Sequence, residues 1–459
     1  MTWHDIGCPV QDRISWWDTP SSRTTGFSQN ASTERVVPVT DLENHKMMTS
    51  WVPGVDPNSD FSLANIPFGI ISVEDDPRDQ RAAVAIGTYV LDLGAISAHP
   101  DFLTIFPCLS EFSDVFTNHI LNPFATLGRQ VHRECRAAIQ DLLSTETRHP
   151  EFLRDNAQLR QEALLPQSAV VMHLPMEIND YTDFYAGYHH AHAVGALFRG
   201  PGRELQPNYT HLPVAYTGRK SSVVVTGASI RRPRGQILFK GSTAPTVALT
   251  RCLDFELELG CFMAKHNQRG TAVKVDDAED KIFGYVLLND WSARDIQQWE
   301  YVPLGPFNGK NFATTISPWV VLADALEPFR TTPIENKTPL QEYLKQSRKD
   351  SVFDIQLEVE LTSRCPPAPG DRCIGGANGS SARGRHHDAL QNKLQTPDVV
   401  VPADDCPSHA RRLYVGVWRS AGVRHHQRAE RRRARQSSRD DGGRQERSAS
   451  PRRQHTCLP

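Results

Sequence analysis

The chain has 459 residues, 39% of them hydrophobic and 23% charged, so it is long enough for two or three domains with buried cores. Its formal net charge of −2 gives no general reason to expect binding to nucleic acid or to a membrane surface. No run of 18 apolar residues occurs, and nine scattered cysteines lack CxxC spacing, which is typical of free thiols in a reducing compartment. We therefore expect a cytoplasmic protein without a transmembrane helix.

The first 58 residues are rich in Ser, Thr, Asp and Pro and show no sustained periodicity. This composition predicts a disordered N-terminal extension over residues 1–58. Met47 and Met48 directly precede the first regularly patterned segment. This position suggests the hypothesis that translation starts at one of them.

A small α/β unit is predicted for residues 59–165. It begins with short runs of β-forming residues that are separated by turn residues. These runs are residues 69–74, 82–87 and 89–94. A single helix is expected to begin at Asn122 and Pro123, because an N-cap followed by Pro favours a helix start. Apolar residues then recur every three or four positions from Phe124 to Leu142, which gives this helix one apolar face.

Residues 166–363 contain many strand patterns and few helical ones, which favours a β-rich sandwich or roll. Within this unit, residues 253–260 read LDFELELG, and apolar residues alternate there with Asp254, Glu256 and Glu258. A period of two predicts one strand with the three carboxylates on one face. Like charges so close repel each other, so a cation or a cluster of Arg and Lys is expected to neutralise them.

Other acidic and histidine residues extend this pattern. Asp183 and Asp290 add two more carboxylates, and carboxylate oxygens without cysteine ligands select a hard cation, Ca²⁺ or Mg²⁺. His189, His190 and His192 are too close in sequence to face one ligand together, so a three-histidine zinc site is not expected. One of them as a general base, or all three as ordinary polar residues, are the open alternatives.

Several polar residues have the spacing of a ligand site. Arg294 and Gln297 are three residues apart, so a helical turn would place them on one face. Lys310 follows Gly and Asn in a loop where the backbone and the ammonium group can approach a ligand. Tyr185 and Arg199 would suit an acidic substrate. Taken singly, each of these residues also has an ordinary structural interpretation.

The composition changes abruptly near Arg364. Residues 364–459 contain 18 Arg, a single Lys and nine acidic residues, so this segment carries +10. It has no Phe, a single Ile and no visible strand or helix period. We expect a disordered, Arg-rich tail. A nucleic-acid-binding tail is one interpretation, and the product of a shifted reading frame or an unspliced intron is the other.

Long segments before that tail resemble the fumarylacetoacetase family, from about Phe61 to Thr362. They are MHLPMEINDYTDFYAGYHHA, HLPVAYTGRKSSVVVTGASIRRPRGQ, LDFELELG and NDWSARDIQQWEYVPLGPFNGKNFATTISPWV. The wider superfamily shares the acidic metal ligands but generally lacks the YTDFY and WEYVPLGPF segments. These motifs therefore favour the narrower family.

The resemblance implies a fold and a reaction. The fold is a small SH3-like N-terminal domain followed by a mixed β-sandwich roll, assembled as a homodimer. The reaction is metal-dependent hydrolysis of the carbon–carbon bond of 4-fumarylacetoacetate to fumarate and acetoacetate, the last step of tyrosine and phenylalanine catabolism. The expected partner is this small β-diketo acid, with no nucleic acid and no membrane.

The resemblance also implies roles for individual residues. The cation, Ca²⁺ or Mg²⁺, would be bound by Asp183, Glu256, Glu258 and Asp290, with Lys310 and Thr314 also placed around magnesium. His190 corresponds to the general base, and Arg294, Gln297 and Lys310 would stabilise the oxyanion. The positions that would contact substrate are Tyr185, Arg199, Tyr216, Gln297 and Tyr301.

The sequence departs from the family pattern after Thr362. A GTISG-type loop that binds substrate and a Glu that orients the catalytic histidine are both missing there. We therefore predict that this chain has a truncated roll over residues 166–363, is poorly folded beyond residue 165, and is inactive or nearly so. The alternatives are a non-catalytic, metal-binding pseudoenzyme with a basic interaction tail and a related acylpyruvate-type hydrolase.

Overall fold

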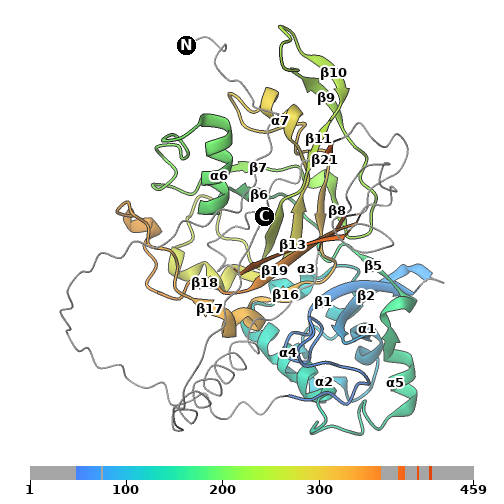
Figure 1. The fold of residues 1–459 in the computed structure, drawn as a ribbon. Coiled ribbons are helices and arrows are strands. Elements are labelled where there is room, and N and C mark those ends of the chain that lie inside the picture. Colours follow the sequence, from blue (N-terminus) through green and yellow to red (C-terminus); the bar gives the residue numbers. More distant parts are fainter. Residues whose placement is uncertain (1–47, 74–75, 363–380, 388–400, 403–412, 416–459) are drawn as a thin grey trace, which may run out of the picture.

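The fold is a mixed α+β arrangement of several small sheets and few helices (Figure 1). The structure, a computed structural model, describes residues 48–73, 76–362, 381–387, 401–402 and 413–415. In Figure 1 the N-terminal unit, blue to teal, lies beside the strands of the larger second unit. No helix in these ranges is long and apolar enough to cross a membrane.

The N-terminal unit is built on a five-stranded antiparallel sheet in the order β4-β3-β2-β1-β5. Its strands are β1 (Phe68–Val73), β2 (Asp76–Ile86), β3 (Tyr89–Asp92), β4 (Leu164–Pro166) and β5 (Val170–His173). The three runs predicted at the start of this unit are therefore confirmed as strands. The SH3-like description stays a prediction.

The helices of this unit pack around its sheet. They are α1 (Leu93–Ser97), α2 (Phe102–Ile105), α3 (Asn122–Thr126), α4 (Arg129–Leu143) and α5 (Ala157–Ala163), with the 3-10 turns η2 (Pro107–Leu109) and η3 (Val115–Thr117). The prediction of one helix from Asn122 to Leu142 is wrong, because Gly128 has φ +92°, outside the helical region, and separates α3 from α4. The Asn122 side chain does not cap α3. It accepts a hydrogen bond from the Glu177 N–H and donates one to the Glu177 carbonyl.

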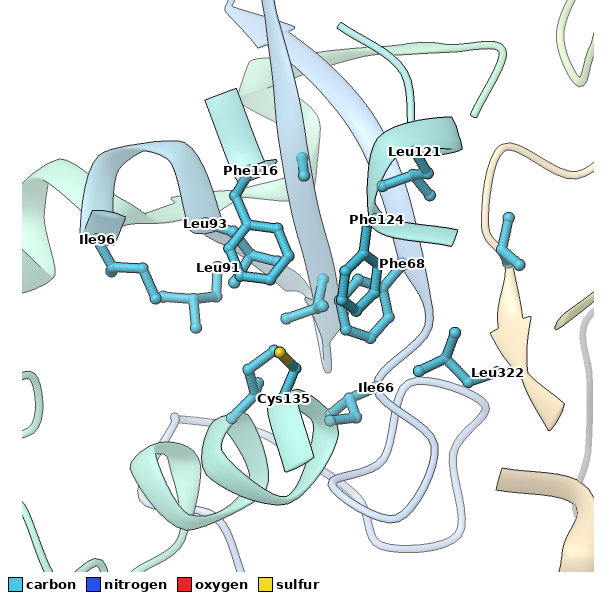
Figure 2. Packing of buried hydrophobic residues seen from close by; sticks show 14 of the residues in the cluster. Ile66, Phe68, Leu91, Leu93, Ile96, Phe116, Leu121, Phe124, Cys135 and Leu322 are labelled. Carbon is cyan, nitrogen blue, oxygen red and sulfur yellow. The ribbon is translucent and has the colours of Figure 1, made fainter. Parts of the chain in front are cut away.

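A large apolar core joins the two units. Phe68, Phe124 and Cys135 are fully buried in it, and Figure 2 shows them among neighbouring apolar side chains. The same cluster contains Phe283 and Leu322 of the second unit. The prediction that the chain is poorly folded beyond residue 165 therefore does not hold in this structure, since those residues complete the core.

The second unit is built around a mixed sheet in the order β12-β13-β15-β8, with β16 also paired to β13. These strands are β8 (Val223–Val225), β12 (Leu257–Met263), β13 (Ile282–Asp290), β15 (Thr314–Ile316) and β16 (Val321–Leu322). The β15–β8 pair is parallel and the other pairs are antiparallel. The description as a sandwich roll stays a prediction.

Smaller elements surround this sheet. Paired strands are β6 (Thr182–Phe184) with β7 (Ala215–Thr217), β9 (Arg234–Ile237) with β10 (Thr246–Leu249), and β17 (Arg330–Thr331) with β18 (Val352–Phe353). β11 (Cys252–Asp254) lies between β14 (Ser292–Ala293) and β21 (Val401–Pro402), and β19 (Gln356–Thr362) lies between β20 (Ser381–His387) and β22 (Leu413–Val415). Helical elements of this unit include α6 (Tyr188–Arg199), α7 (Arg294–Glu300), η7 (Glu279–Lys281), η8 (Ala323–Phe329) and η9 (Glu342–Leu344).

The single strand predicted for residues 253–260 is wrong. The segment forms β11 and β12, which belong to different sheets, and Phe255 and Glu256 lie between them. The Phe255 N–H donates to the Asp254 carboxylate, and the Glu256 N–H donates to the Asn289 side chain, so these amides leave the strand ladders. This interruption turns the alternating carboxylates toward different partners.

The predicted disordered ends also differ from the structure in part. Residues 48–58 pack on the first unit, where Val52 is buried and the Trp51 indole N–H donates to the Leu142 carbonyl. Within residues 364–459, three short strands (β20, β21 and β22) pair with β19 and β11. The expectation of disorder is wrong for these stretches, and the remaining parts of both ends lie outside the described residues.

Candidate active site

Three carboxylates meet where three sheet segments come together. Asp183 lies on β6, Glu258 on β12 and Asp290 at the end of β13, and one oxygen of each lies within 4.8 Å of the others. The ladder between β13 and β15 pairs Asp290 with Thr314, which places Thr314 beside the same group. We call Asp183, Glu258 and Asp290 the carboxylate cluster.

Glu256 is linked to this cluster through Lys310. The Lys310 ammonium donates to Glu256 Oε2 at 2.6 Å and to Asp290 Oδ2 at 2.5 Å. Arg294 Nη2 lies 2.9 Å from Glu256 Oε1 and 2.7 Å from Asp254 Oδ2. The result is a chain of alternating charges from Asp254 through Arg294, Glu256 and Lys310 to Asp290.

The loop before Lys310 is shaped by Glu300. Its carboxylate accepts hydrogen bonds from the N–H groups of Phe307 at 3.0 Å and Gly309 at 2.6 Å. A Cβ atom at Gly309 would lie 2.8 Å from Gln297 Cβ, so only glycine permits this approach to α7. These contacts deliver the Lys310 side chain, which is 5% exposed, to the two acids.

Burial and neighbouring charges shift the ionisation of this group. Burial, together with the negative charges of Glu256, Glu258 and Asp183, raises the pKa of Asp290 well above its ordinary value despite its ion pair with Lys310. Burial opposes ionisation of Glu256, but Lys310 and Arg294 outweigh it and lower the pKa of Glu256. Burial also opposes the charge on Lys310, but Asp290 and Glu256 raise its pKa, so the ammonium keeps its proton.

The residues present fit a divalent cation. Five carboxylates (Asp183, Asp254, Glu256, Glu258 and Asp290) are accompanied by two permanent cations, Lys310 and Arg294. The excess negative charge is partly buried, and an oxygen-only donor set suits Ca²⁺ or Mg²⁺. A protonated Lys310 has no lone pair for a metal, so in this arrangement it neutralises acids.

The candidate general base lies next to this chain of charges. His190 is in the first turn of α6, and its Nε2 is 3.4 Å from Glu256 Oε1. The ring of Tyr185 meets the His190 ring edge to face, with centroids 5.6 Å apart. The neighbouring His189 packs on the ring of Tyr188. The structure therefore singles out His190 from the adjacent histidines.

The predicted substrate residues are placed less uniformly. The Tyr216 hydroxyl donates to Asp290 Oδ2 at 3.5 Å, and Gln297 Oε1 accepts from Arg294 Nη1 at 3.2 Å. The Tyr301 ring packs against Phe198 of α6. Arg199, however, ends α6 and donates to the carbonyls of Arg203 and Glu204. The structure thus uses Arg199 to close the turn after α6 and does not bring its guanidinium to the carboxylates.

A cavity of about 810 Å³ reaches the carboxylate cluster. The cluster and Thr314 form its polar part, and apolar side chains such as Leu259, Phe262 and Val286 form much of the remainder. His190, Arg294 and Lys310 do not line it. The cavity therefore does not by itself define where a substrate would meet the candidate base.

Sequence reasoning missed three residues that organise this site. Asp254 was expected on the cation face but holds Arg294, and Glu300 was not singled out at all. The hydroxyl of Tyr181 lies 3.3 Å from Thr314 Oγ1. The sequence indicated Tyr181 only as part of the YTDFY segment. No local sequence pattern indicates that Asp254 pairs with Arg294 or that Glu300 binds the loop before Lys310.

The mixed α+β fold and the group of carboxylate oxygens identify a protein with a candidate site for a hard cation such as Ca²⁺ or Mg²⁺. Comparison with known families gives two matches: "Fumarylacetoacetase N-terminal" covers residues 64–175, and "Fumarylacetoacetate (FAA) hydrolase C-terminal" covers residues 180–404. The chain belongs to the fumarylacetoacetase family.

Individual relatives agree with this assignment. The chain is 56% identical to the fumarylacetoacetase of Emericella nidulans over 321 residues, which is 69% of this chain and 74% of that protein. It is 47% identical to the fumarylacetoacetase of Homo sapiens over 313 residues, which is 68% of this chain and 72% of the human protein. The similarity therefore covers both units.

Proposed function

We propose that this chain hydrolyses the carbon–carbon bond of 4-fumarylacetoacetate, giving fumarate and acetoacetate, with Ca²⁺ or Mg²⁺ bound at the carboxylate cluster. The observation that carries the proposal is the partly buried carboxylate cluster, with its excess negative charge, beside Lys310 and His190 in a chain related to enzymes named fumarylacetoacetase. This reaction would be the last step of tyrosine and phenylalanine catabolism. A cytoplasmic location and a homodimer are further parts of the proposal.

The cation would be held by Asp183, Glu258 and Asp290, with Glu256 next to them. When bound, it would supply Lewis-acid polarisation of the diketone oxygens. Lys310 favours the ionised form of Glu256 and holds Glu256 and Asp290 close together before a cation arrives. Thr314 adds a hydroxyl oxygen beside the cluster.

His190 accepts a proton from water, and the resulting hydroxide attacks the carbonyl carbon at the fumaryl end. The carbon–carbon bond then breaks, and its electron pair leaves with the acetoacetate part as an enolate that takes up a proton. Glu256, 3.4 Å from His190 Nε2, stabilises the imidazolium that forms. Arg294, Gln297 and Lys310 provide hydrogen-bond donors for the negative oxygen of the tetrahedral intermediate.

The test is turnover by the purified 459-residue chain, measured as fumarate and acetoacetate released with and without Mg²⁺ or Ca²⁺. We expect cation-dependent product, and a loss of about 100-fold or more in kcat for His190→Gln. His189→Gln is the matched control. Its kcat is expected to stay within about threefold of the wild-type value, because the His189 ring packs on the Tyr188 ring.

An acylpyruvate offered as a comparison substrate distinguishes the broader hydrolase alternative. Preference for the acylpyruvate would contradict the proposed substrate. Cation binding without turnover of either compound would favour the pseudoenzyme. It would also agree with the predicted inactivity of a chain that departs from the family pattern after Thr362.

A further inference from the structure

Two cysteines lie side by side in the N-terminal unit, on elements that contribute nothing to the carboxylate cluster. Cys108 is in η2 and Cys135 is in α4, 27 residues later, and their Sγ atoms are 3.6 Å apart. Cys135 is fully buried in the apolar core (Figure 2), while Cys108 is half-buried. One thiol of the pair is therefore open to a reagent and the other is not.

We propose that Cys108 and Cys135 form a modification site that a low-molecular-weight disulfide, such as glutathione disulfide, oxidises reversibly to an intramolecular disulfide. A disulfide bond is about 2 Å long, so the two sulfur atoms need to approach by roughly 1.5 Å. The two sulfur atoms already face each other across a hydrogen bond, so they start close to bonding distance. This inference is independent of the proposed function.

The chemistry assigns different roles to the two thiols. The Cys108 thiolate attacks one sulfur of glutathione disulfide, the disulfide bond breaks, and one glutathione thiolate leaves. Cys135 then gives up its proton and attacks the Cys108 sulfur of the mixed disulfide, and the second glutathione leaves. The two cysteines lose two electrons and two protons, and the reagent is reduced to two molecules of glutathione.

The local environment supports this order of attack. The hydrogen bond between the two thiols lowers the pKa of Cys108, which, with its greater exposure, favours Cys108 as the first nucleophile. The same hydrogen bond, followed by burial, raises the pKa of Cys135. Cys135 is thus protected from external reagents and reacts only when a mixed disulfide at Cys108 is presented to it.

The disulfide would connect two separate parts of the N-terminal core. It would close a loop of the chain that includes η3 and α3, and it would fix η2 against α4. Because a cross-link reduces the freedom of the unfolded chain, the oxidised protein is expected to unfold at a temperature a few degrees higher than the reduced protein.

The experiment incubates the reduced full-length chain with glutathione disulfide under native conditions, blocks remaining thiols, and maps tryptic peptides by mass spectrometry. Cleavage after Arg and Lys puts Cys108 in residues 82–129 and Cys135 in residues 134–136. We expect these two peptides to be joined, with the link removed by dithiothreitol. The Cys135→Ser variant should instead accumulate glutathione on Cys108, and Cys108→Ser should give no link.

A variant in which the other seven cysteines are serine removes competing exchange and should give the same link. The proposal is overturned if the wild-type chain stops at the mixed disulfide, or if the link appears only after unfolding in urea. It is also overturned if other pairs form before this one. Thermal unfolding of the oxidised chain, with Cys108→Ser as the control, then checks the expected stabilisation.

Discussion

At the scale of single residues, the site depends on two cations, the buried Lys310 and the largely buried Arg294, that pair with acidic side chains. Lys310 is 5% exposed and bonds to Glu256 and Asp290. Lys310→Met leaves these acids without their cation, so the free energy of unfolding is expected to fall by about 3 kcal/mol in the presence of EDTA. Urea denaturation measures the change.

The matched control is Lys345→Met. Lys345 forms an ion pair with Glu342 on the surface, and the two side chains are 54% and 87% exposed. Its loss is expected to cost less than about 0.5 kcal/mol, because solvent screens an exposed pair. Equal effects of the two substitutions would contradict the role given to Lys310.

Asp254 is the second residue whose role can be tested alone. It is buried, and its Oδ2 accepts from Arg294 Nε at 2.8 Å. Asp254→Asn weakens this charged contact, so kcat/KM is expected to fall about 10- to 100-fold while the unfolding temperature changes little. Asp155→Asn, at an exposed pair with Arg154, is the control. A similar loss of activity in both variants would rule out positioning of Arg294 by Asp254.

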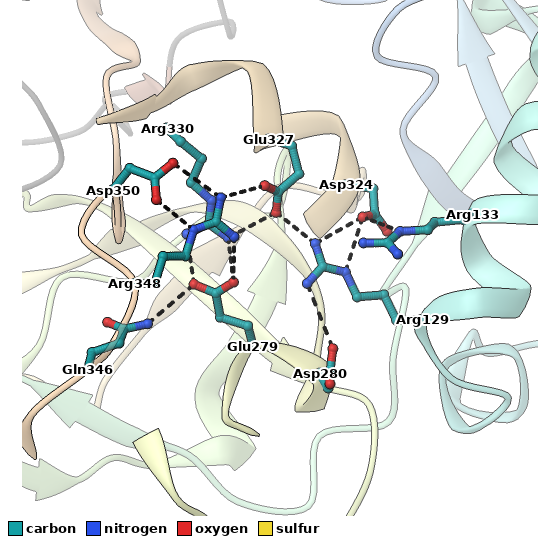
Figure 3. A network of polar contacts seen from close by, with 10 residues as sticks. All are labelled: Arg129, Arg133, Glu279, Asp280, Asp324, Glu327, Arg330, Gln346, Arg348 and Asp350. Carbon is teal, nitrogen blue, oxygen red and sulfur yellow. Dashed lines mark hydrogen bonds and ion pairs between the residues drawn. The ribbon is translucent and has the colours of Figure 1, made fainter. Parts of the chain in front are cut away.

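At the scale of secondary-structure elements, α4 is tied to the second unit by an ion-pair network (Figure 3). Arg129 Nη2 lies 2.9 Å from Asp324 and 2.7 Å from Glu327, both in η8, and Arg133 also bonds to Asp324. Arg330 and Arg348 bond to Glu327 from the other direction. The network therefore adds polar contacts to the apolar core that joins the two units.

Arg129→Gln is expected to lower the free energy of unfolding by about 2 kcal/mol, because it leaves partly buried carboxylates short of a partner. Arg148→Gln is the control, since Arg148 is 78% exposed and its ion pair with Asp141 is screened by solvent. Chemical denaturation of both variants measures the free energy of unfolding. A larger loss for Arg148→Gln than for Arg129→Gln would contradict the role given to the Arg129 ion pairs.

The same network predicts a pH dependence. Burial opposes ionisation of Glu327, but hydrogen bonds from Arg330 and Arg129 lower its pKa to about 2 from the ordinary 4.5. The stability that Glu327 contributes is thus present above about pH 4.5 and is lost as pH falls toward 2.

The destabilisation caused by Glu327→Gln, measured by urea denaturation, should therefore shrink between pH 6 and pH 3. The exposed Glu342→Gln variant is the control and is expected to change stability by under about 0.5 kcal/mol at neutral pH. A constant effect of Glu327→Gln across this range would contradict the assignment.

At the scale of the whole molecule, the proposed cation would couple the sheets that supply the carboxylates. Asp183, Glu258 and Asp290 come from three strands of two sheets, so an ion bound to all three would hold these segments together. Mg²⁺ or Ca²⁺ at about 100 times its dissociation constant should stabilise the folded chain by about 2.7 kcal/mol. Thermal unfolding with and without the ion measures this shift.

Asp183→Asn should remove most of the stabilisation by the ion. Asp277→Asn, at an exposed acidic residue in a separate 3-10 turn, should leave it unchanged. Loss of the stabilisation in both variants would show that the ion acts away from the carboxylate cluster.

The homodimer and the reduced activity of this chain stay predictions at this scale. Sedimentation tests the first, with twice the 51.4 kDa chain mass as the expected result. Sequencing the transcript around Thr362 tests whether a shifted reading frame or an unspliced intron causes the reduced activity.

The sequence by itself determined the family and three strands of the N-terminal sheet, β1, β2 and β3, and it predicted the oxygen-rich group of carboxylates as a hard-cation site. These features depend on local periodicity, residue type and contiguous motifs, which a linear pattern contains. The tertiary structure alone decided that Gly128 separates α3 from α4, that Asp254 holds Arg294, and that Arg199 turns to the carbonyls after α6. The physical reason is that a charged side chain takes its role from whichever opposite charge or carbonyl the folded chain brings within hydrogen-bond distance.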